Sequence, residues 1–180
     1  MGKIFKGREV ADNISEKLVK RVDELKKKGK SPTLAILRVG VNPSDLAYER
    51  GAVNRAEKIG VKTRILELDE TSTTDEVLEK IDVLNSDDTV HGVLIFRPLP
   101  KHIDDDKVRN RLKADKDVDG IGDVSMAKIY RGDPSGFAPC TAKACIEILK
   151  HFDVEIKGKK AVVIGRSMVI GKPVAMMLLN

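Results

Sequence analysis

The chain has 180 residues, enough for one ordinary domain or for one domain and part of another. Hydrophobic residues make up 41% and charged residues 34%, which is typical of a globular protein and excludes a disordered chain. No apolar run approaches the roughly 18 residues of a membrane span, and the N-terminus lacks an apolar signal-peptide core. The two cysteines, Cys140 and Cys145, predict neither a disulfide framework nor a metal site. We therefore expect a cytoplasmic protein with no membrane partner.

The net charge of +5 and the isoelectric point near 9.1 raise the question of nucleic-acid binding. Aromatic residues are only 3% of the chain, too few for the stacking platforms of single-strand binders. Lysines such as those at 26–28 follow a predicted helix, where they favour the helix dipole. We expect anionic small molecules rather than nucleic acid as ligands, and a basic nucleic-acid binder is the weakest alternative.

Apolar residues three or four positions apart predict a first helix from about Val10 to Leu25, ended by Gly29. Further helices and buried strands alternate along the chain. The predicted strands are 33–39, 63–68 and 90–96, and the predicted helices are 43–59, 73–85, one before 115, and 139–152. Thr73 and Glu76 form a predicted capping box. The alternation predicts an α/β fold, a parallel sheet with helices on both faces, and one unit over residues 1–150.

Ligands of such sheets bind where the strands end at their carboxyl side. In this chain the corresponding loops are 39–45 and 97–101, with 115–122 following the next helix. We expect the functional residues of the first unit to lie in these loops.

The last thirty residues differ from the rest. Ala161–Ile164 predicts a strand, and a glycine turn and a helix from Gly171 follow, as at the start of a nucleotide-binding domain. The dinucleotide template G-x-G-x-x-G is incomplete, because Ser167 and Ile170 stand where it requires glycine. A lone strand–helix pair has no parallel partner, so residues 151–180 are expected to be the first strand, turn and helix of an incomplete second domain.

A helical tyrosine, a Pro-x-Pro loop or an Asp-Gly turn is usually structural when it occurs alone. Here they occur in order with other motifs, in segments 44–61, 92–100, 115–120, 139–141 and 157–179. Together these segments resemble the bifunctional methylenetetrahydrofolate dehydrogenase/methenyltetrahydrofolate cyclohydrolase family. Its members typically show Ser-x-x-Tyr-Val-x-x-Lys, Gly-Val-Leu-Val-Gln-Leu-Pro-Leu-Pro, Lys-Asp-Val-Asp-Gly, Pro-Cys-Thr-Pro and Gly-Arg-Ser-x-x-Val-Gly-x-Pro. The resemblance covers essentially the whole chain.

The resemblance implies an N-terminal parallel α/β folate-binding catalytic domain and the start of a Rossmann-like NADP-binding domain, with the active site between them. Tyr48 corresponds to the folate-stacking tyrosine, and Asp119 to the aspartate that accepts hydrogen bonds from the pterin ring. Both are candidate catalytic and substrate-binding residues, and Pro98 is a further candidate for substrate binding. A tetrahydrofolate one-carbon derivative is the implied substrate, and a homodimer is the implied assembly.

The resemblance also implies five cofactor-binding residues. Gly165, Arg166 and Ser167 correspond to the NADP-binding turn, Gly171 begins the helix behind it, and Thr141 corresponds to a threonine near the nicotinamide. The amides of a helix N-terminus and a guanidinium both suit phosphate. Arg166 favours NADP, although NAD is not excluded, because the residue that usually decides this choice follows the second strand of such a domain.

The departures from the family motifs concern its active-site lysine and glutamine, replaced here by Ala52 and Phe96. Further departures are Arg97, the pair Ile121-Gly122 and Ala142. A lysine with a lowered pKa can move a proton in hydrolysis, which alanine cannot do. We therefore expect NADP-dependent oxidation of 5,10-methylenetetrahydrofolate with weak or absent cyclohydrolase activity. A non-catalytic folate-binding module is the main alternative.

Overall fold

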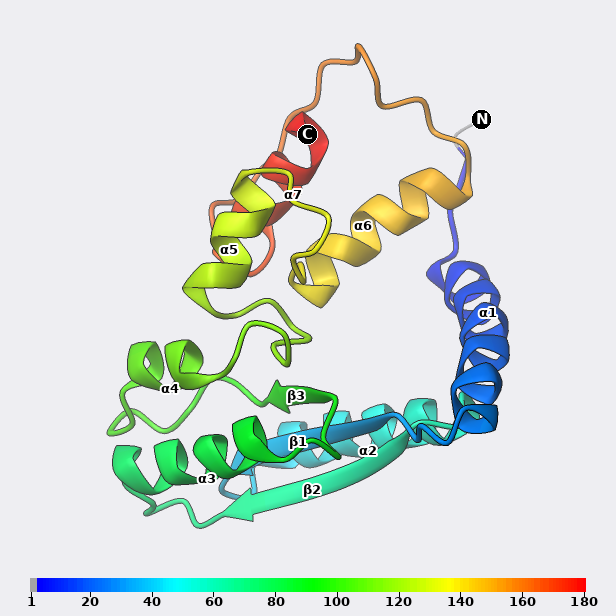
Figure 1. The fold of residues 1–180 in the computed structure, drawn as a ribbon. Coiled ribbons are helices and arrows are strands. Elements are labelled where there is room, and N and C mark those ends of the chain that lie inside the picture. The colour runs from blue at the N-terminus through cyan, green and yellow to red at the C-terminus, as the bar shows by residue number, and fades with distance from the viewer. Residues whose placement is uncertain (1–2) are drawn as a thin grey trace.

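The computed structural model describes residues 3–180 and shows three strands alternating with helices (Figure 1). In chain order the elements are α1 (Gly7–Lys27), β1 (Thr33–Val39), α2 (Pro43–Lys58), β2 (Lys62–Leu68), α3 (Thr74–Ser86), β3 (Gly92–Ile95), α4 (Asp105–Arg111), α5 (Asp123–Tyr130), α6 (Cys140–His151) and α7 (Gly171–Leu179). Within the described residues, no helix has both the length and the apolar character needed to cross a bilayer. The predicted α/β class is confirmed.

Local signals in the sequence set the helix ends. The predicted capping box is present at α3, where Thr73 Oγ1 accepts from the Glu76 amide and the Glu76 carboxylate accepts from the Thr73 amide. Helix α1 ends as predicted before Gly29, which has a φ of +76°. Helix α2 has Pro43 in its first turn, and the Asn42 side chain accepts from the Ser44 amide.

The three strands form a parallel sheet in the order β2-β1-β3. The central strand β1 is buried on both faces, which explains its mostly apolar sequence, and Ile36 and Leu37 are fully buried. Helix α3 contributes Val77 and Ile81 to the core that includes Leu37. Helices α2 and α3 lie on opposite faces of the sheet, as predicted (Figure 1).

The predicted strand Ala161–Ile164 is wrong, because these residues form no strand. The side chains of Val162 and Ile164 are 86% and 98% exposed. A strand needs a neighbour for its backbone groups, and none of the described residues pairs with this segment. The following helix α7 does form at Gly171 and packs against α5 and α6.

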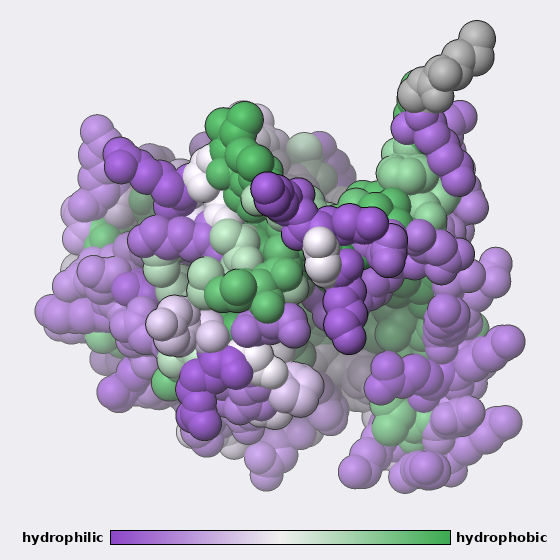
Figure 2. Space-filling model, turned by 90° about the horizontal axis from the view of Figure 1, so that it is seen from above, coloured by the Kyte–Doolittle hydropathy of each residue, from purple (hydrophilic) through white to green (hydrophobic). Residues whose placement is uncertain are grey.

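The sequence interpretation also missed α5, a short helix whose composition carries no clear periodicity. It lies beside α7 on the side of the molecule away from the sheet (Figure 1). Viewed from above, this face has hydrophobic side chains at its surface (Figure 2), and Leu179 of α7 is 77% exposed.

The boundary at residue 150 between two domains stays a prediction.

Candidate functional site

Tyr48 and Asp119 line one cavity of about 360 Å3 at the carboxyl end of β3. Asp45 and Arg97 also line it, and Val169 borders it from the loop before α7. All three loops expected to carry functional residues therefore meet here, as parallel strands require. The structure places Tyr48 and Asp119 together as predicted, and their roles in binding stay predictions.

One wall of this cavity is aromatic. The rings of Tyr48 and Phe96 lie with their centroids 5.2 Å apart and their planes at 52°. Phe96 is buried, whereas Tyr48 is 60% exposed, so the tyrosine ring remains accessible to a planar ligand. Burial raises the pKa of the Tyr48 phenol, and the negative charge of Asp119 and the Cys140 thiol raise it further. The phenol therefore stays protonated at neutral pH.

Asp119 owes its position to a neighbour that the sequence interpretation treated only as part of a turn. Asp117 is 1% exposed and accepts hydrogen bonds from the amides of Ile121 (3.0 Å) and Gly122 (2.9 Å) and from Ser125 Oγ (2.6 Å). Gly120 has a φ of +62°, and a Cβ there would lie 2.5 Å from the Phe137 carbonyl oxygen. This loop can therefore hold Asp119 in one place. The spacing Asp-x-Asp-Gly was the available signal for Asp117.

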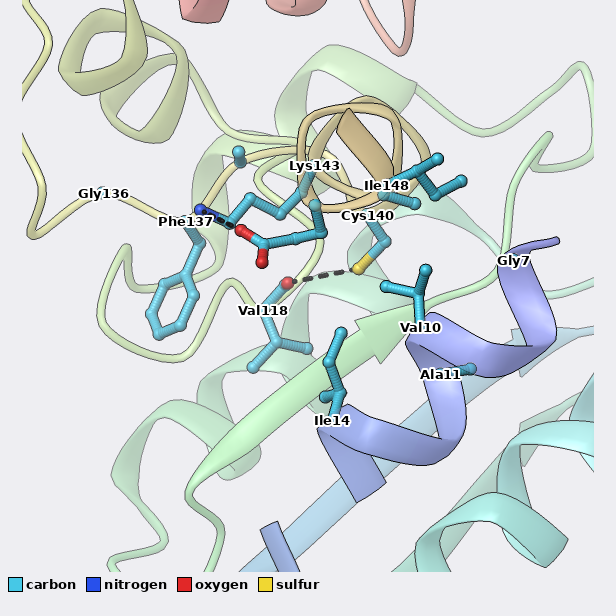
Figure 3. Close-up of a pocket in the computed structure, with 13 residues that line it drawn as sticks. Gly7, Val10, Ala11, Ile14, Val118, Gly136, Phe137, Cys140, Lys143 and Ile148 are labelled. Carbon is cyan, nitrogen blue, oxygen red and sulfur yellow. Dashed lines mark hydrogen bonds and ion pairs between the residues drawn. The ribbon is translucent and has the colours of Figure 1, made fainter. Parts of the chain in front are cut away.

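The Asp119 carboxylate contacts the start of α6. Its Oδ1 accepts from the Cys140 amide at 3.1 Å, and among residues 3–180 no amide and no charged side chain donates to Oδ2. The Cys140 residue is exposed overall, but its Sγ turns inward and donates to the Val118 carbonyl oxygen at 3.7 Å (Figure 3). Burial of the thiol, its hydrogen bond to the Asp119 side chain and the negative charge of Asp119 raise its pKa to about 12. Oδ2 is thus the carboxylate oxygen available to a ligand, and the thiol is a poor nucleophile.

Arg97 is held by an ion pair that sequence patterns do not reveal. Its Nε donates to Asp105 Oδ1 at 2.7 Å, and Nη2 contacts Oδ2 of the same carboxylate. Besides the Tyr48 cavity, Arg97 lines an adjoining cavity of about 180 Å3 that also includes Asp119 and Val169. The guanidinium thus lies between the folate-site candidates and the loop before α7, with its charge largely offset by Asp105.

Pro98 and Thr141 lie outside the Tyr48 cavity. Pro98 lines a neighbouring cavity of about 480 Å3 with Asn42 and Lys101, and the two cavities share only Asp45. Thr141 is exposed on the first turn of α6. The structure therefore does not gather all of the predicted site residues in one place.

The predicted cofactor turn has tight backbone geometry. Gly165 has a φ of +145°, and a Cβ on Gly171 would lie 2.3 Å from the Gly165 carbonyl oxygen, so both positions require glycine. Ser167 Oγ accepts from the amides of Ile170 (3.0 Å) and Gly171 (3.3 Å), which caps α7. Arg166 is exposed beside this turn. Gly165 has no described neighbour within 4 Å of an added Cβ, so its backbone is open to a ligand.

A fourth cavity, also of about 480 Å3, lies on the other side of the Asp119 loop, between α1 and α6 (Figure 3). Val10 and Ile14 of α1 face Ile148 of α6 across it, and Val118 borders it. Val118 and Asp119 are neighbours in sequence but line different cavities. Because its walls are mostly apolar, this cavity lacks the convergent polar groups of the Tyr48 cavity.

Comparison with protein families gives two matches. Residues 5–119 match the catalytic domain of tetrahydrofolate dehydrogenase/cyclohydrolase, and residues 139–180 match the NAD(P)-binding domain of that family. Two similar relatives are both named bifunctional protein FolD. The relative from Alkaliphilus oremlandii is 50% identical over 180 residues, covering 100% of this chain and 63% of the relative. The relative from Clostridioides difficile is 50% identical over 179 residues, covering 99% and 62%.

Solved structures agree with these matches. The bifunctional FolD of Campylobacter jejuni has a TM-score of 0.96 at 37% identity, covering 98% of this chain and 63% of that one. The Trypanosoma brucei FolD, complexed with NADP cofactor and inhibitor, has a TM-score of 0.92 at 30% identity, covering 99% and 61%. The chain spans about 63% of the length of the curated relative from Alkaliphilus oremlandii.

Proposed function

The chain belongs to the tetrahydrofolate dehydrogenase/cyclohydrolase family, and from this we propose that its Tyr48 cavity binds a reduced folate for NADP-dependent oxidation of 5,10-methylenetetrahydrofolate to 5,10-methenyltetrahydrofolate. The observation that carries the proposal is the shared cavity of Tyr48 and Asp119, bordered by Val169 from the segment that matches the NAD(P)-binding domain. The cavity therefore has access both to a candidate folate site and to a candidate cofactor site.

Two residues are proposed to hold the substrate. The accessible ring of Tyr48 provides a stacking face for a pterin, and Asp119 Oδ2 provides an acceptor for its N–H donors. Because Oδ1 is already engaged by the Cys140 amide, the free oxygen has a defined direction. Such preorganisation favours one orientation of the bound ring, which is the main contribution of a protein to hydride transfer. Pro98 is proposed to contact the substrate only at its margin.

The proposed cofactor residues are Gly165, Arg166, Ser167 and Gly171, with Thr141 on α6. The open backbone at Gly165 and the exposed guanidinium of Arg166 fit a phosphate group. Ser167 engages two amides at the start of α7, so a phosphate would have to replace this cap to use them. When bound, NADP would supply the acceptor for the hydride. Arg166 favours NADP, and NAD stays compatible because the residue that usually decides this choice follows the second strand of such a domain.

We propose that cyclohydrolase activity is weak or absent. Ala52 is half-buried on α2, one turn after Tyr48, where the family motif has lysine. Phe96 carries no amide to orient a proton carrier. Arg97 is not a substitute, because a guanidinium does not release its proton near neutral pH and this one is paired with Asp105.

A direct test measures both activities of the protein that carries this sequence. We expect NADP-dependent formation of methenyltetrahydrofolate, and loss of added methenyltetrahydrofolate no faster than its spontaneous hydrolysis. The matched variants are Ala52→Lys alone and Ala52→Lys with Phe96→Gln, of which only the double variant is expected to restore part of the hydrolysis. A fast enzyme-dependent loss in the parent protein would contradict the proposal about cyclohydrolase, and absence of any folate oxidation would contradict the dehydrogenase assignment.

A non-catalytic folate-binding module is the second candidate. It is favoured by segment 161–164, which is exposed and pairs with no strand among the described residues, because a dinucleotide-binding turn ordinarily follows a paired strand. Thermal or urea unfolding of the 180-residue chain with and without NADP distinguishes the dehydrogenase from the non-catalytic module. Binding at 100 times the dissociation constant would stabilise the chain by about 2.7 kcal/mol. No stabilisation by NADP, combined with stabilisation by a folate, would favour the module.

We further propose a homodimer, which the family resemblance implies. Strand β2 is at the edge of the described sheet and pairs only with β1, so its other edge is open to a second chain. Analytical ultracentrifugation tests this, and a monomer at micromolar concentration would contradict it.

A further inference from the structure

The Tyr48 cavity has an excess of negative charge. Two carboxylates, Asp45 and Asp119, line it together with one cation, Arg97. The guanidinium of Arg97 makes two contacts with Asp105, which does not line this cavity, so most of its positive charge is offset from outside. The carboxylates of Asp45 and Asp119 have no comparable cationic partner among the described residues. A ligand in the cavity therefore experiences a net negative potential.

The aromatic wall formed by Tyr48 and Phe96 also favours a positively charged ligand. The faces of aromatic rings carry partial negative charge and attract cations within about 6 Å of the ring centre. Phe96 is 5% exposed and therefore held in place, and the Tyr48 ring packs against it at 5.2 Å between centroids. The phenol of Tyr48 stays neutral because burial and Asp119 raise its pKa. Two rings and two carboxylates thus surround one space of about 360 Å3.

We propose that this cavity selects the cationic product of the reaction, a planar methenyl folate, over neutral reduced folates. The inference rests on the proposed function and specifies which ligand the same site prefers. In the oxidation, a C–H bond of the methylene carbon breaks and its electron pair leaves as hydride to the oxidised nicotinamide cofactor. A nitrogen lone pair then forms a C=N bond, and one positive charge is shared by the two nitrogens. The charge that develops is the charge that the cavity favours.

Three positions that differ from the family motifs fit this preference, whereas a fourth, Arg97, adds a cation that is paired with Asp105. Ala52 removes the ammonium group that the motif lysine would place one turn from Tyr48, and Phe96 replaces an amide by an aromatic ring. Asp45 is three positions before the tyrosine, where the motif has serine, and adds a carboxylate. The changes at Asp45 and Phe96 make the cavity lining more negative and more aromatic, and the change at Ala52 removes a positive charge from its surroundings. Three independent positions therefore change the electrostatics in one direction.

The test compares two folates by isothermal titration of the 180-residue chain, under mildly acidic conditions in which the methenyl cation persists. The probes are 5,10-methenyltetrahydrofolate, whose ring system is cationic, and 5-formyltetrahydrofolate, whose ring system is uncharged; both carry the same glutamate carboxylates. We expect the parent chain to bind the cation about tenfold more tightly. Asp45→Asn and Phe96→Leu should each lower this ratio about threefold or more, while affinity for the neutral folate changes less than about twofold. Circular dichroism shows whether each variant is folded.

The control is Glu57→Gln, an exposed carboxylate on the same helix as Tyr48 that does not line the cavity. It should leave the ratio unchanged. Equal affinity of the parent for both folates, or an unchanged ratio in both cavity variants, overturns this inference and leaves the proposed folate site standing. Failure of the parent to bind either folate overturns the proposed function as well as the inference.

Discussion

Two mostly apolar segments of this chain are similar in composition and different in structure. Residues 33–39 and 161–164 are both short and rich in residues that favour strands. The first is the central strand β1, hydrogen-bonded to β2 and β3, and its Ile36 is 0% exposed. The second is no strand, and its Ile164 is 98% exposed. The comparison shows that strand propensity forms a strand only where neighbours satisfy the backbone and cover the side chains.

The largest expected difference between these segments is in hydrogen exchange. Amides of β1 should exchange only through global or near-global opening, at least about a thousandfold more slowly than the amides of 161–164. Mass spectrometry after peptic digestion measures both segments in one sample, and sedimentation confirms the oligomeric state. Strong protection of 161–164 in a monomer would contradict the structure described here.

A matched pair of substitutions measures the same contrast as free energy. Ile36→Ala should lower the free energy of unfolding by about 2–5 kcal/mol, because it leaves a cavity in the sheet core. Ile164→Ala removes the same atoms from an exposed side chain and should change it by less than about 0.5 kcal/mol. Urea unfolding measures both values. Similar losses in the two variants would mean that the second segment is buried in solution.

Asp117 and Asp119 lie in the same loop, but the Asp117 carboxylate is buried and hydrogen-bonded, whereas the Asp119 carboxylate is accessible. Asp117→Ala should destabilise the chain by about 1–3 kcal/mol, because three donors lose their buried acceptor. Asp119→Ala removes one hydrogen bond at an exposed helix end and should cost about 1 kcal/mol or less. The loss of folate binding should instead be larger for Asp119→Ala than for Asp117→Ala, because Asp119 carries the free oxygen. A variant Asp119→Ala that is folded and binds a folate analogue as well as the parent would refute the role of Asp119.

The smallest effect concerns the two cysteines of α6. The Cys140 thiol has a pKa of about 12, so at pH 8 it should react with iodoacetamide at least several-fold more slowly than Cys145. Asp119→Asn should lower this pKa and speed the reaction of Cys140, with Cys145 as the internal control. Because the folded pKa is above the value of about 8.5 for a free thiol, the protonated thiol contributes stability at neutral pH. This contribution decreases as the pH rises from about 8.5 towards 12.

Most of the N-terminal architecture was predictable from local sequence. Apolar periodicity predicted α1, the capping box of Thr73 and Glu76 marked α3, and alternating strands and helices predicted the parallel sheet. These signals act within a few residues, so no knowledge of tertiary contacts was needed. The glycine turn before α7 was predictable for the same reason, because Gly165 and Gly171 meet stereochemical demands that other residues cannot.

The candidate site was predictable only in part. The motifs singled out Tyr48 and Asp119, and the carboxyl-end rule for parallel sheets placed their loops together. The ion pair of Arg97 with Asp105 and the supporting hydrogen bonds of Asp117 were not predictable, because they join side chains whose directions depend on the folded loops. Pro98 is the opposite case: the motifs predicted it as a site residue, but it lines a neighbouring cavity and not the Tyr48 cavity.

The sequence by itself determined where most of the helices lie, which strand is buried on both faces, and which family the motifs resemble. Tertiary structure alone decided that 33–39 pairs while 161–164 does not, that Val118 and Asp119 line different cavities, and that Arg97 is neutralised by Asp105. The physical reason is the range of the interactions. Propensity, capping and periodicity act over a few residues, whereas strand pairing, burial and charge balance depend on groups that only folding brings together.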